Sequence, residues 1–270
     1  MAVRMRDLFS GSVDALRFEP TAKRIRVCLS GDAVVQTEEA LLVWEPRRIV
    51  PAYALPIAAM QNHLVPAGAE SGDDDVDRPG ADRAVLDPTV PFGAHTAAGT
   101  EFDVIAGEYT AAAAAFRPED PDLADYVVLD FDSFEWREED EPILSHPRDP
   151  FKRIDVLASS RHVRIEVDDT LLAESSRPML LFETMLPVRF YLPREDVKVR
   201  LQHSDTVSFC AYKGRASYFS VPDGPRDVAW TYHEPLHDGE PVRDRICFFD
   251  ERVDVTVNGV PRDRPVTPFS

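Results

Sequence analysis

The sequence has few cysteines, few lysines and no long apolar run, and each shortage excludes a class of protein. The cysteines, Cys28, Cys210 and Cys247, are odd in number and far apart, which fits reduced thiols and excludes a paired-cysteine zinc knuckle. No segment approaches the roughly 18 consecutive apolar residues of a membrane-spanning helix, and residues 1–20 lack the apolar core of a signal peptide. These absences predict a cytoplasmic protein with no membrane partner.

Lysine is so scarce that nearly all basic residues are arginine, and this bias, with abundant Ala, Asp and Val, suggests a high-GC bacterial genome. The formal net charge of -18 makes the protein strongly acidic. Non-specific binding to nucleic acid depends on Lys and Arg displacing condensed counterions from phosphates. We therefore expect no nucleic-acid partner, whereas a local basic pocket for a small anion is compatible with this composition.

The chain contains an internal repeat. Its 270 residues, 44% of them hydrophobic, suffice for two domains with real cores. Residues 25–45 align without a gap on residues 163–183, with apolar residues facing apolar ones at most strand positions. The identical pairs at this offset are Arg26 and Arg164, Leu42 and Leu180, Glu45 and Glu183, and Tyr53 and Tyr191.

Each copy opens with the period-two alternation of a strand, as in residues 163–167. Further short strands are predicted at residues 197–201, 206–212, 217–221, 228–232, 246–249 and 253–257. Only Thr110–Phe116 and Asp120–Tyr126 resemble short helices. The predicted fold class is mainly β, with two tandem small antiparallel modules of the same fold, each a barrel or sandwich, and little helix.

The predicted domain order is an N-terminal extension, a degenerate first module, a second module and a C-terminal tail. These correspond to residues 1–20, 21–150, 160–262 and 263–270. Residues 153–156 and 252–255 both read Arg-(Ile/Val)-Asp-Val, so each copy is expected to close with this strand. Residues 66–99, rich in Gly, Pro, Asp and Ala, are interpreted as a solvated surface loop, with a lid or a cation-binding acidic run as alternatives.

Aromatic, cationic and carboxylate side chains are concentrated between Met179 and Ser220. The motifs in and after this tract are Leu180–Thr184, Arg189–Pro193, Cys210–Tyr218, Trp230–Tyr232 and Glu251–Val255. In this order they resemble the family catalogued as domain of unknown function 427. The resemblance covers the second half of the chain and implies a small, mostly β domain without established chemistry.

Two functions from different classes fit this tract. In the leading hypothesis the second module binds a small anionic metabolite in an aromatic and cationic pocket. Its ligand-binding residues would be Glu183, Arg189, Tyr191, Tyr212, Lys213, Tyr218 and Trp230. Arg189 and Lys213 would meet the charge, with internal salt bridges as their alternative role, and Glu183 and Tyr191 would be mainly architectural. The rival is a non-enzymatic protein–protein interaction module that uses the same aromatic tract.

If the second module is catalytic, Cys210 is the candidate nucleophile and Lys213 or Tyr212 the candidate acid or base. A catalytic thiolate needs a nearby cation, which Lys213 or Arg189 could supply, but core packing is the common role of a strand cysteine. No metal or cofactor is predicted. The zinc-protease pattern His233-Glu-Pro-Leu-His237 is interrupted by Pro235, which is incompatible with the helix that the pattern requires.

The first module has Pro51 in the place assigned to Arg189 and Ala106–Tyr109 in the region assigned to Tyr212–Gly214. It therefore lacks the cationic half of the proposed site. We expect one ligand per chain.

Overall fold

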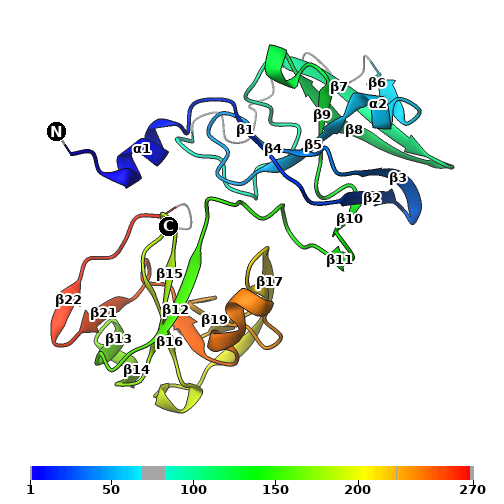
Figure 1. The fold of residues 1–270 in the computed structure, drawn as a ribbon. Coiled ribbons are helices and arrows are strands. Elements are labelled where there is room, and N and C mark those ends of the chain that lie inside the picture. The colour runs from blue at the N-terminus through cyan, green and yellow to red at the C-terminus, as the bar shows by residue number, and fades with distance from the viewer. Residues whose placement is uncertain (1, 69–82, 223, 268–270) are drawn as a thin grey trace. The chain divides into compact units, whose positions relative to one another are not determined.

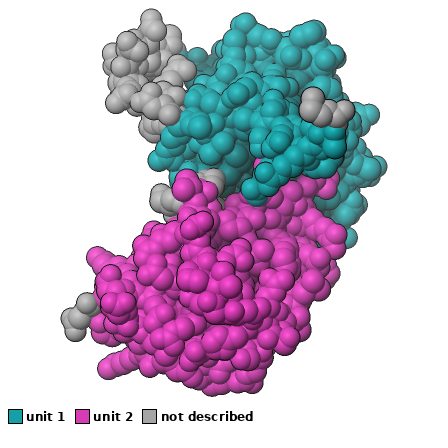
Figure 2. Space-filling model, turned by 90° about the vertical axis from the view of Figure 1, so that its left-hand side faces the viewer, with its two compact units in different colours: residues 1–149 teal, residues 150–270 magenta. Residues whose placement is uncertain are grey.

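The computed structural model describes residues 2–68, 83–222 and 224–267. The chain divides into two compact units, residues 1–149 and residues 150–270, which Figure 2 shows in two colours. Both units are built largely of short antiparallel strands (Figure 1). None of the described helices is long and apolar enough to cross a membrane.

Unit 1 contains a seven-stranded sheet and a four-stranded sheet. The large sheet consists, in spatial order, of β1 (Arg17–Pro20), β4 (Leu41–Trp44), β5 (Ala52–Pro56), β9 (Tyr126–Leu129), β8 (Tyr109–Pro118), β7 (Gly99–Ala106) and β6 (Leu64–Pro66). The small sheet consists of β11 (Glu141–Pro142), β10 (Glu135–Glu138), β2 (Ile25–Leu29) and β3 (Asp32–Thr37). The described helices of this unit are short: α1 (Met5–Gly11), α2 (Ile57–Met60) and the 3-10 helix η1 (Pro121–Leu123).

Unit 2 has the same two kinds of sheet. Its large sheet consists of β12 (Ile154–Ala158), β15 (Met179–Glu183), β16 (Arg189–Leu192), β20 (Ile246–Phe248), β19 (Ala229–Thr231), β18 (Gly214–Ser220) and β17 (Gln202–Cys210). Its small sheet consists of β14 (Thr170–Ser175), β13 (Val163–Val167), β21 (Asp254–Val257) and β22 (Val260–Arg262). Two 3-10 helices, η2 (Arg194–Asp196) and η3 (His237–Val242), lie in the connections.

The two units have identical strand orders. Each strand of unit 1 has a counterpart at the same place in the same kind of sheet of unit 2, from β1 and β12 through to β11 and β22. This confirms the predicted fold class, which was mainly β with two tandem modules of one fold and little helix. Of the two predicted shapes, the structure has the sandwich-like one, and neither unit is a closed barrel.

Alternation along the strands sorts the side chains of unit 2 into two layers. Leu180 and Phe190 of the large sheet pack with Val163 and Ile165 of the small sheet to form the core between the sheets. Their sequence neighbours Leu181 and Tyr191 belong to a second cluster on the opposite face of the large sheet. We call this the far face, meaning the face of the large sheet directed away from the small sheet.

The strand ladders correct one predicted equivalence. Leu42 pairs with Tyr53 in unit 1, whereas Leu180 pairs with Phe190 in unit 2. Since Leu42 and Leu180 are counterparts, Tyr53 corresponds to Phe190 and not to Tyr191. A shift of one residue moves side chains to the other face of a sheet. Tyr53 accordingly packs between the sheets, while Tyr191 lies on the far face.

The predicted closing strand of the first copy is also wrong. Residues 154–158 do not close unit 1: they form β12, which pairs with β15 at the edge of the large sheet of unit 2. The counterpart of β12 is β1, so residues 17–20 are a strand of the fold and not part of an extension. The counterpart of β21 is β10. A four-residue pattern with alternating apolar positions fits many strands, which is why the two matching segments occupy different places.

Three local predictions differ from the structure. Thr110–Phe116 lies within β8, which pairs with β7 on one side and β9 on the other, so tertiary pairing overrides the helix propensity of its alanines. Asp120–Tyr126 contains only the single turn of η1. Residues 197–201 form no strand, and Val197 makes one isolated bridge to Ala173.

The predicted loop at residues 66–99 is only partly described, because residues 69–82, with the acidic run, lie outside the described residues. Residues 83–98 are not a solvated loop, since Leu86 and Val90 are buried. The Arg48 guanidinium donates hydrogen bonds to the backbone carbonyls of Val90 and its neighbours. The composition of this segment did not predict its burial, because the arginine that anchors its backbone comes from a distant part of the sequence.

Candidate functional site

An aromatic cluster covers the far face of unit 2. Tyr191 and Trp230 are buried, and Trp230 Nε1 donates a hydrogen bond to Tyr191 Oη at 3.1 Å. Phe249 packs against Trp230 with ring centroids 4.5 Å apart, and the half-buried Tyr218 stacks on Phe249 at 6.2 Å. Burial raises the pKa of Tyr191 well above its usual value, so this phenol stays protonated. Three of the predicted ligand-binding residues therefore belong to one cluster, with Tyr218 the most accessible.

Lys213 lies in the turn between β17 and β18 and is buried. Its Nζ donates a hydrogen bond to Glu183 Oε2 at 2.6 Å, and the two side chains are 9% and 12% exposed. Glu183 ends β15, and Lys213 directly precedes β18. Because β16, β20 and β19 lie between these two strands, the ion pair links distant parts of the large sheet. Burial acts to lower the pKa of Lys213, but Cys210 and Glu183 outweigh it and the pKa is raised. Lys213 is thus a buried ammonium.

The segment that contains η3 covers Lys213. The Leu236 N–H donates to the Lys213 carbonyl at 3.1 Å, and Gly214 forms a bridge with Pro235. A Cβ at Gly239 would lie 3.2 Å from the Lys213 Cα, a tighter contact than most Cβ atoms make. Glycine at this position therefore favours the close approach.

Arg189 is also buried, and its guanidinium is held by a carboxylate of the same unit. Nη1 and Nη2 donate to the two oxygens of Glu251 at 2.8 and 2.6 Å, and the guanidinium lies over the Trp230 ring at 5.7 Å. Burial acts to lower the pKa of Arg189, but the hydrogen bonds to Glu251 and the neighbouring negative charge raise it. Arg189 and Lys213 were expected to meet the charge of a ligand, with internal salt bridges as the alternative. In the structure both are buried, and each forms an ion pair with a carboxylate of unit 2.

Cys210 ends β17 and is half-buried, and it acts to raise the pKa of Lys213, three residues further along the chain. His203 belongs to the same strand as Cys210 but lies far from it. It pairs with Phe219, whereas Cys210 pairs with Gly214 at the other end of the same ladder, roughly 20 Å away at the usual rise per strand residue. Tyr212 is buried in the turn beside Lys213. The structure thus brings Cys210, Tyr212 and Lys213 together, with His203 at the other end of the ladder.

The two histidines of the zinc-protease pattern contact different aspartates. His233 Nδ1 lies 2.6 Å from Asp244, and His237, at the start of η3, lies 2.7 Å from Asp238. Their segment is a bridge and a 3-10 turn and not the α-helix that the pattern needs. Across the part of the chain that the structure describes, no group of three or more His, Cys, Asp or Glu side chains could hold a metal ion.

The counterpart of this site in unit 1 follows from the ladders across the large sheet. Glu45 occupies the place of Glu183, and its oxygens accept hydrogen bonds from the Thr96 and Ala97 amides and contact the His95 ring. The far-face row that reads Tyr191, Cys247, Trp230 and Tyr218 in unit 2 reads Ala54, Val128, Phe116 and Glu101 in unit 1.

Lys213 lies five residues before Tyr218, and Thr96 lies five residues before Glu101. Since Tyr218 and Glu101 are counterparts, Thr96 is the counterpart of Lys213. The assignment of Ala106–Tyr109 to this place was therefore wrong. In both units the carboxylate is held by the segment that leads into the same strand, by backbone amides in unit 1 and by an ammonium in unit 2. Arg48 also approaches Glu45, at 3.9 Å. The first unit consequently has a cation of its own, Arg48, near this carboxylate.

Sequence analysis missed Asp250 and Glu251 as partners of Arg189. Burial acts to raise the pKa of Glu251, but the hydrogen bonds from Arg189 and Thr267 lower it. Asp250, 3.9 Å from Arg189, is buried as well. The available signal was two adjacent carboxylates directly after the buried strand β20, a position where ionised side chains need a partner.

The comparisons with known proteins concern the second half of the chain. No curated protein matches the sequence. Residues 155–259 contain all of the predicted ligand-binding residues, and this segment matches the family described as Domain of unknown function (DUF427).

Proposed function

We propose that unit 2 binds a small anionic molecule at the end of the far face formed by Lys213, Cys210 and Tyr218. The observation that carries this proposal is the buried Lys213 ammonium, which donates a hydrogen bond to Glu183 and follows the half-buried Cys210 by three residues in the same turn. An ammonium has three donors, and the hydrogen bond to Glu183 uses one of them. A fixed cation favours an anion over the neutral or cationic solutes that the surrounding acidic protein would otherwise attract.

The other predicted residues would serve this site as its supporting wall. Arg189 is paired through two hydrogen bonds with Glu251 and lies over Trp230, so its proposed role is to hold the aromatic cluster in place. Tyr191 and Trp230 are joined by a hydrogen bond and are nearly inaccessible. The Lys213 ammonium would be kept oriented by its ion-pair partner Glu183 and by Tyr212, which is buried beside it.

Any catalysis at this site would use Cys210 as nucleophile, because an adjacent cation favours the reactive thiolate. Lys213 or Tyr212 would then handle the proton, since His203 lies at the far end of the ladder. Composition supports a bacterial, cytoplasmic protein without nucleic-acid partners as the setting for this activity.

Calorimetry with phosphate and with succinate at low salt would test the proposal. Wild type is expected to bind one equivalent per chain, and Lys213→Met combined with Glu183→Leu to bind none, because this pair of changes removes the ammonium without leaving Glu183 unpaired. Lys198→Met removes an exposed lysine of the same unit and is the matched control. Unchanged binding by the double variant, or two equivalents per wild-type chain, would contradict the proposal.

The rival function, a protein interaction module, is favoured by a different observation. β17 is the edge strand of the large sheet, and its Val207 and Phe209 are 39% and 51% exposed. Edge strands with exposed apolar side chains are sites at which other chains add. Loss of a co-purifying protein upon Phe209→Ser, with phosphate and succinate binding absent in wild type, would favour this function over the first.

We also propose that unit 1 is a degenerate copy of unit 2. The identical strand orders and the shared place of Glu45 and Glu183 support a duplication. Its far face lacks the Tyr191–Trp230 pair, with Ala54 and Phe116 at these places. This is the basis for expecting a single equivalent of ligand.

A further inference from the structure

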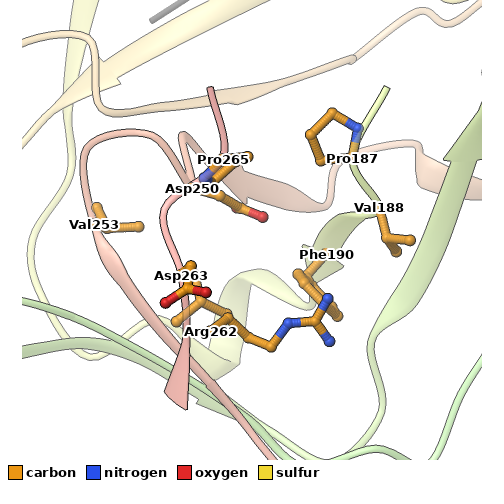
Figure 3. A pocket seen from close by; sticks show the side chains of 9 residues that line it. Pro187, Val188, Phe190, Asp250, Val253, Arg262, Asp263 and Pro265 are labelled. Atoms are coloured by element: carbon orange, nitrogen blue, oxygen red, sulfur yellow. The ribbon is translucent and has the colours of Figure 1, made fainter. Parts of the chain in front are cut away.

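Unit 2 contains a cavity on the other side of its large sheet, beside the core between the sheets. Its volume is about 110 Å³, and it is lined mainly by apolar side chains of β16, β21 and neighbouring segments. Asp250, Arg262 and Asp263 are the charged members of this lining. An oxygen of Asp250 points toward the space between the labelled side chains, and the guanidinium of Arg262 extends toward Phe190 (Figure 3).

The same place in unit 1 is filled by aromatic rings. Val27 pairs with Trp136 in unit 1 as Ile165 pairs with Val255 in unit 2, so Trp136 and Val255 are counterparts. The same ladders, extended by residue count, give the remaining pairs: Tyr53 for Phe190, Phe131 for Asp250, Phe134 for Val253 and Ile143 for Arg262.

The unit 1 rings form one packed stack. Trp136 stacks on Tyr53 and on Phe131, with centroids 5.4 Å apart in each case, and its Nε1 donates to the Phe131 carbonyl at 2.9 Å. In unit 2 the indole is replaced by the small side chain of Val255, and the ring of Phe131 by the carboxylate of Asp250. The backbone plan is unchanged, so the removed rings leave space that unit 2 does not fill with its own side chains.

We propose that this cavity binds a small planar ring that carries an N–H donor, in the place that the indole of Trp136 occupies in unit 1. Asp250 accepts the hydrogen bond from the ring, and Phe190 and Arg262 lie against its faces. An apolar cavity of about 150 Å³ holds benzene. This pocket of about 110 Å³ is smaller but partly open, so it suits a single ring, and a small fused ring only with part of the ligand at the opening. Arginine guanidinium groups stack readily on aromatic faces.

The electrostatics of Asp250 agree with a donor ligand. Its side chain is 10% exposed and its nearest cation among the described contacts is Arg189 Nη1 at 3.9 Å, a group already engaged with both oxygens of Glu251. Burial raises the pKa of Asp250 to about 7, with Arg189 and Arg262 acting to lower it and Glu251 to raise it. A buried carboxylate that faces open space gains most from a ligand that donates a hydrogen bond to it. This site is independent of the anion site, because Phe190 and Tyr191 point to opposite faces of the sheet.

Two probes that differ in one atom test the proposal without any substitution. Indole carries the N–H donor, and benzofuran has the same shape with oxygen in its place. Titrations of the full chain followed by amide NMR shifts should show saturable indole binding at Asp250, Val253 and Val255. Benzofuran should bind at least tenfold more weakly, the factor expected for a hydrogen bond to a carboxylate.

Substitutions then locate the ring. Val255→Trp should fill the cavity as Trp136 does in unit 1 and abolish binding, while Thr256→Trp adds the same ring on the opposite side of β21 and should leave binding unchanged. Asp250→Leu should bind indole and benzofuran equally, and it decides the question if Val255→Trp does not fold. Equal affinities of wild type for the two probes, indole shifts outside the cavity, or full binding by folded Val255→Trp would overturn the proposal.

Discussion

Replacing Lys213 by methionine is expected to destabilise unit 2 by about 3–5 kcal/mol, the usual cost of removing one partner from a buried ion pair. Methionine retains most of the apolar stem but leaves the Glu183 carboxylate without the ammonium that lies 2.6 Å from it. Glu183 is only 12% exposed, so water cannot replace the lost partner. Loss of one partner of an exposed pair, such as Arg243 with Glu240, would cost far less, because water solvates the charge that is left.

The double variant Lys213→Met, Glu183→Leu should recover most of that loss, because two apolar residues often replace a buried ion pair without net cost. The sign of the pH dependence is also fixed. Since the pKa of Lys213 is raised in the folded chain, its contribution to the free energy of unfolding is complete at neutral pH and is lost only as the pH rises through that raised pKa.

Native-state hydrogen exchange is the appropriate assay, since it resolves the stability of unit 2 separately from that of unit 1. Lys198→Met, at an exposed lysine, provides the baseline. The reasoning is refuted if Lys213→Met lies within about 1 kcal/mol of wild type, the range of exposed pairs, or if the double variant is less stable than the single one.

Three further outcomes are expected. Relative to Asp250→Asn, wild type should lose stability as the pH rises from 3.8 to about 7, because the raised pKa of Asp250 keeps this carboxyl protonated to a higher pH in the folded than in the unfolded chain. The loss in the free energy of unfolding is at most about 4 kcal/mol. A pH-independent difference between the two proteins in urea unfolding would contradict this. An aromatic disulfide reagent should label Cys210 well before the fully buried Cys247, and Lys213→Met should slow the labelling of Cys210, whereas equal rates would remove the basis for a reactive thiol. Chelators should leave the melting temperature unchanged, and stoichiometric zinc in an elemental analysis of untagged protein would overturn that expectation.

The sequence predicts local features of this fold well. Alternating apolar residues identify the strands of unit 2 from β17 to β21 to within a few residues, and the turn at Asn258 and Gly259 has the positive φ values typical of such pairs. Register is not predictable in this way. The gap-free alignment matches Tyr53 with Tyr191, whereas the ladders match it with Phe190. This shift of one residue depends on the length and path of the connection after β4, which the identical residues do not reveal.

The candidate site was predictable as a set of residue types but not as a set of contacts. Arg189 and Glu251 are 62 positions apart in the sequence, and no local pattern relates them. The same holds for Lys213 and Glu183, whose pairing depends on the arrangement of the whole large sheet. An internal salt bridge was the alternative role of each of these cations. Only the geometry of the folded chain distinguishes such a salt bridge from contact with a ligand.

The two units show how one strand plan can serve two purposes. Where unit 1 stacks Trp136 between other aromatic rings, unit 2 has Val255, and the space beside it contains a buried carboxylate. Burying an ionised group costs free energy that aromatic packing would not, so such a substitution destabilises unit 2 unless something else occupies the space. Departures from the best packing are expected at functional sites. Since unit 1 demonstrates that rings fit this place in the fold, the open cavity of unit 2 is better explained by a ligand than by an inability of the fold to fill it.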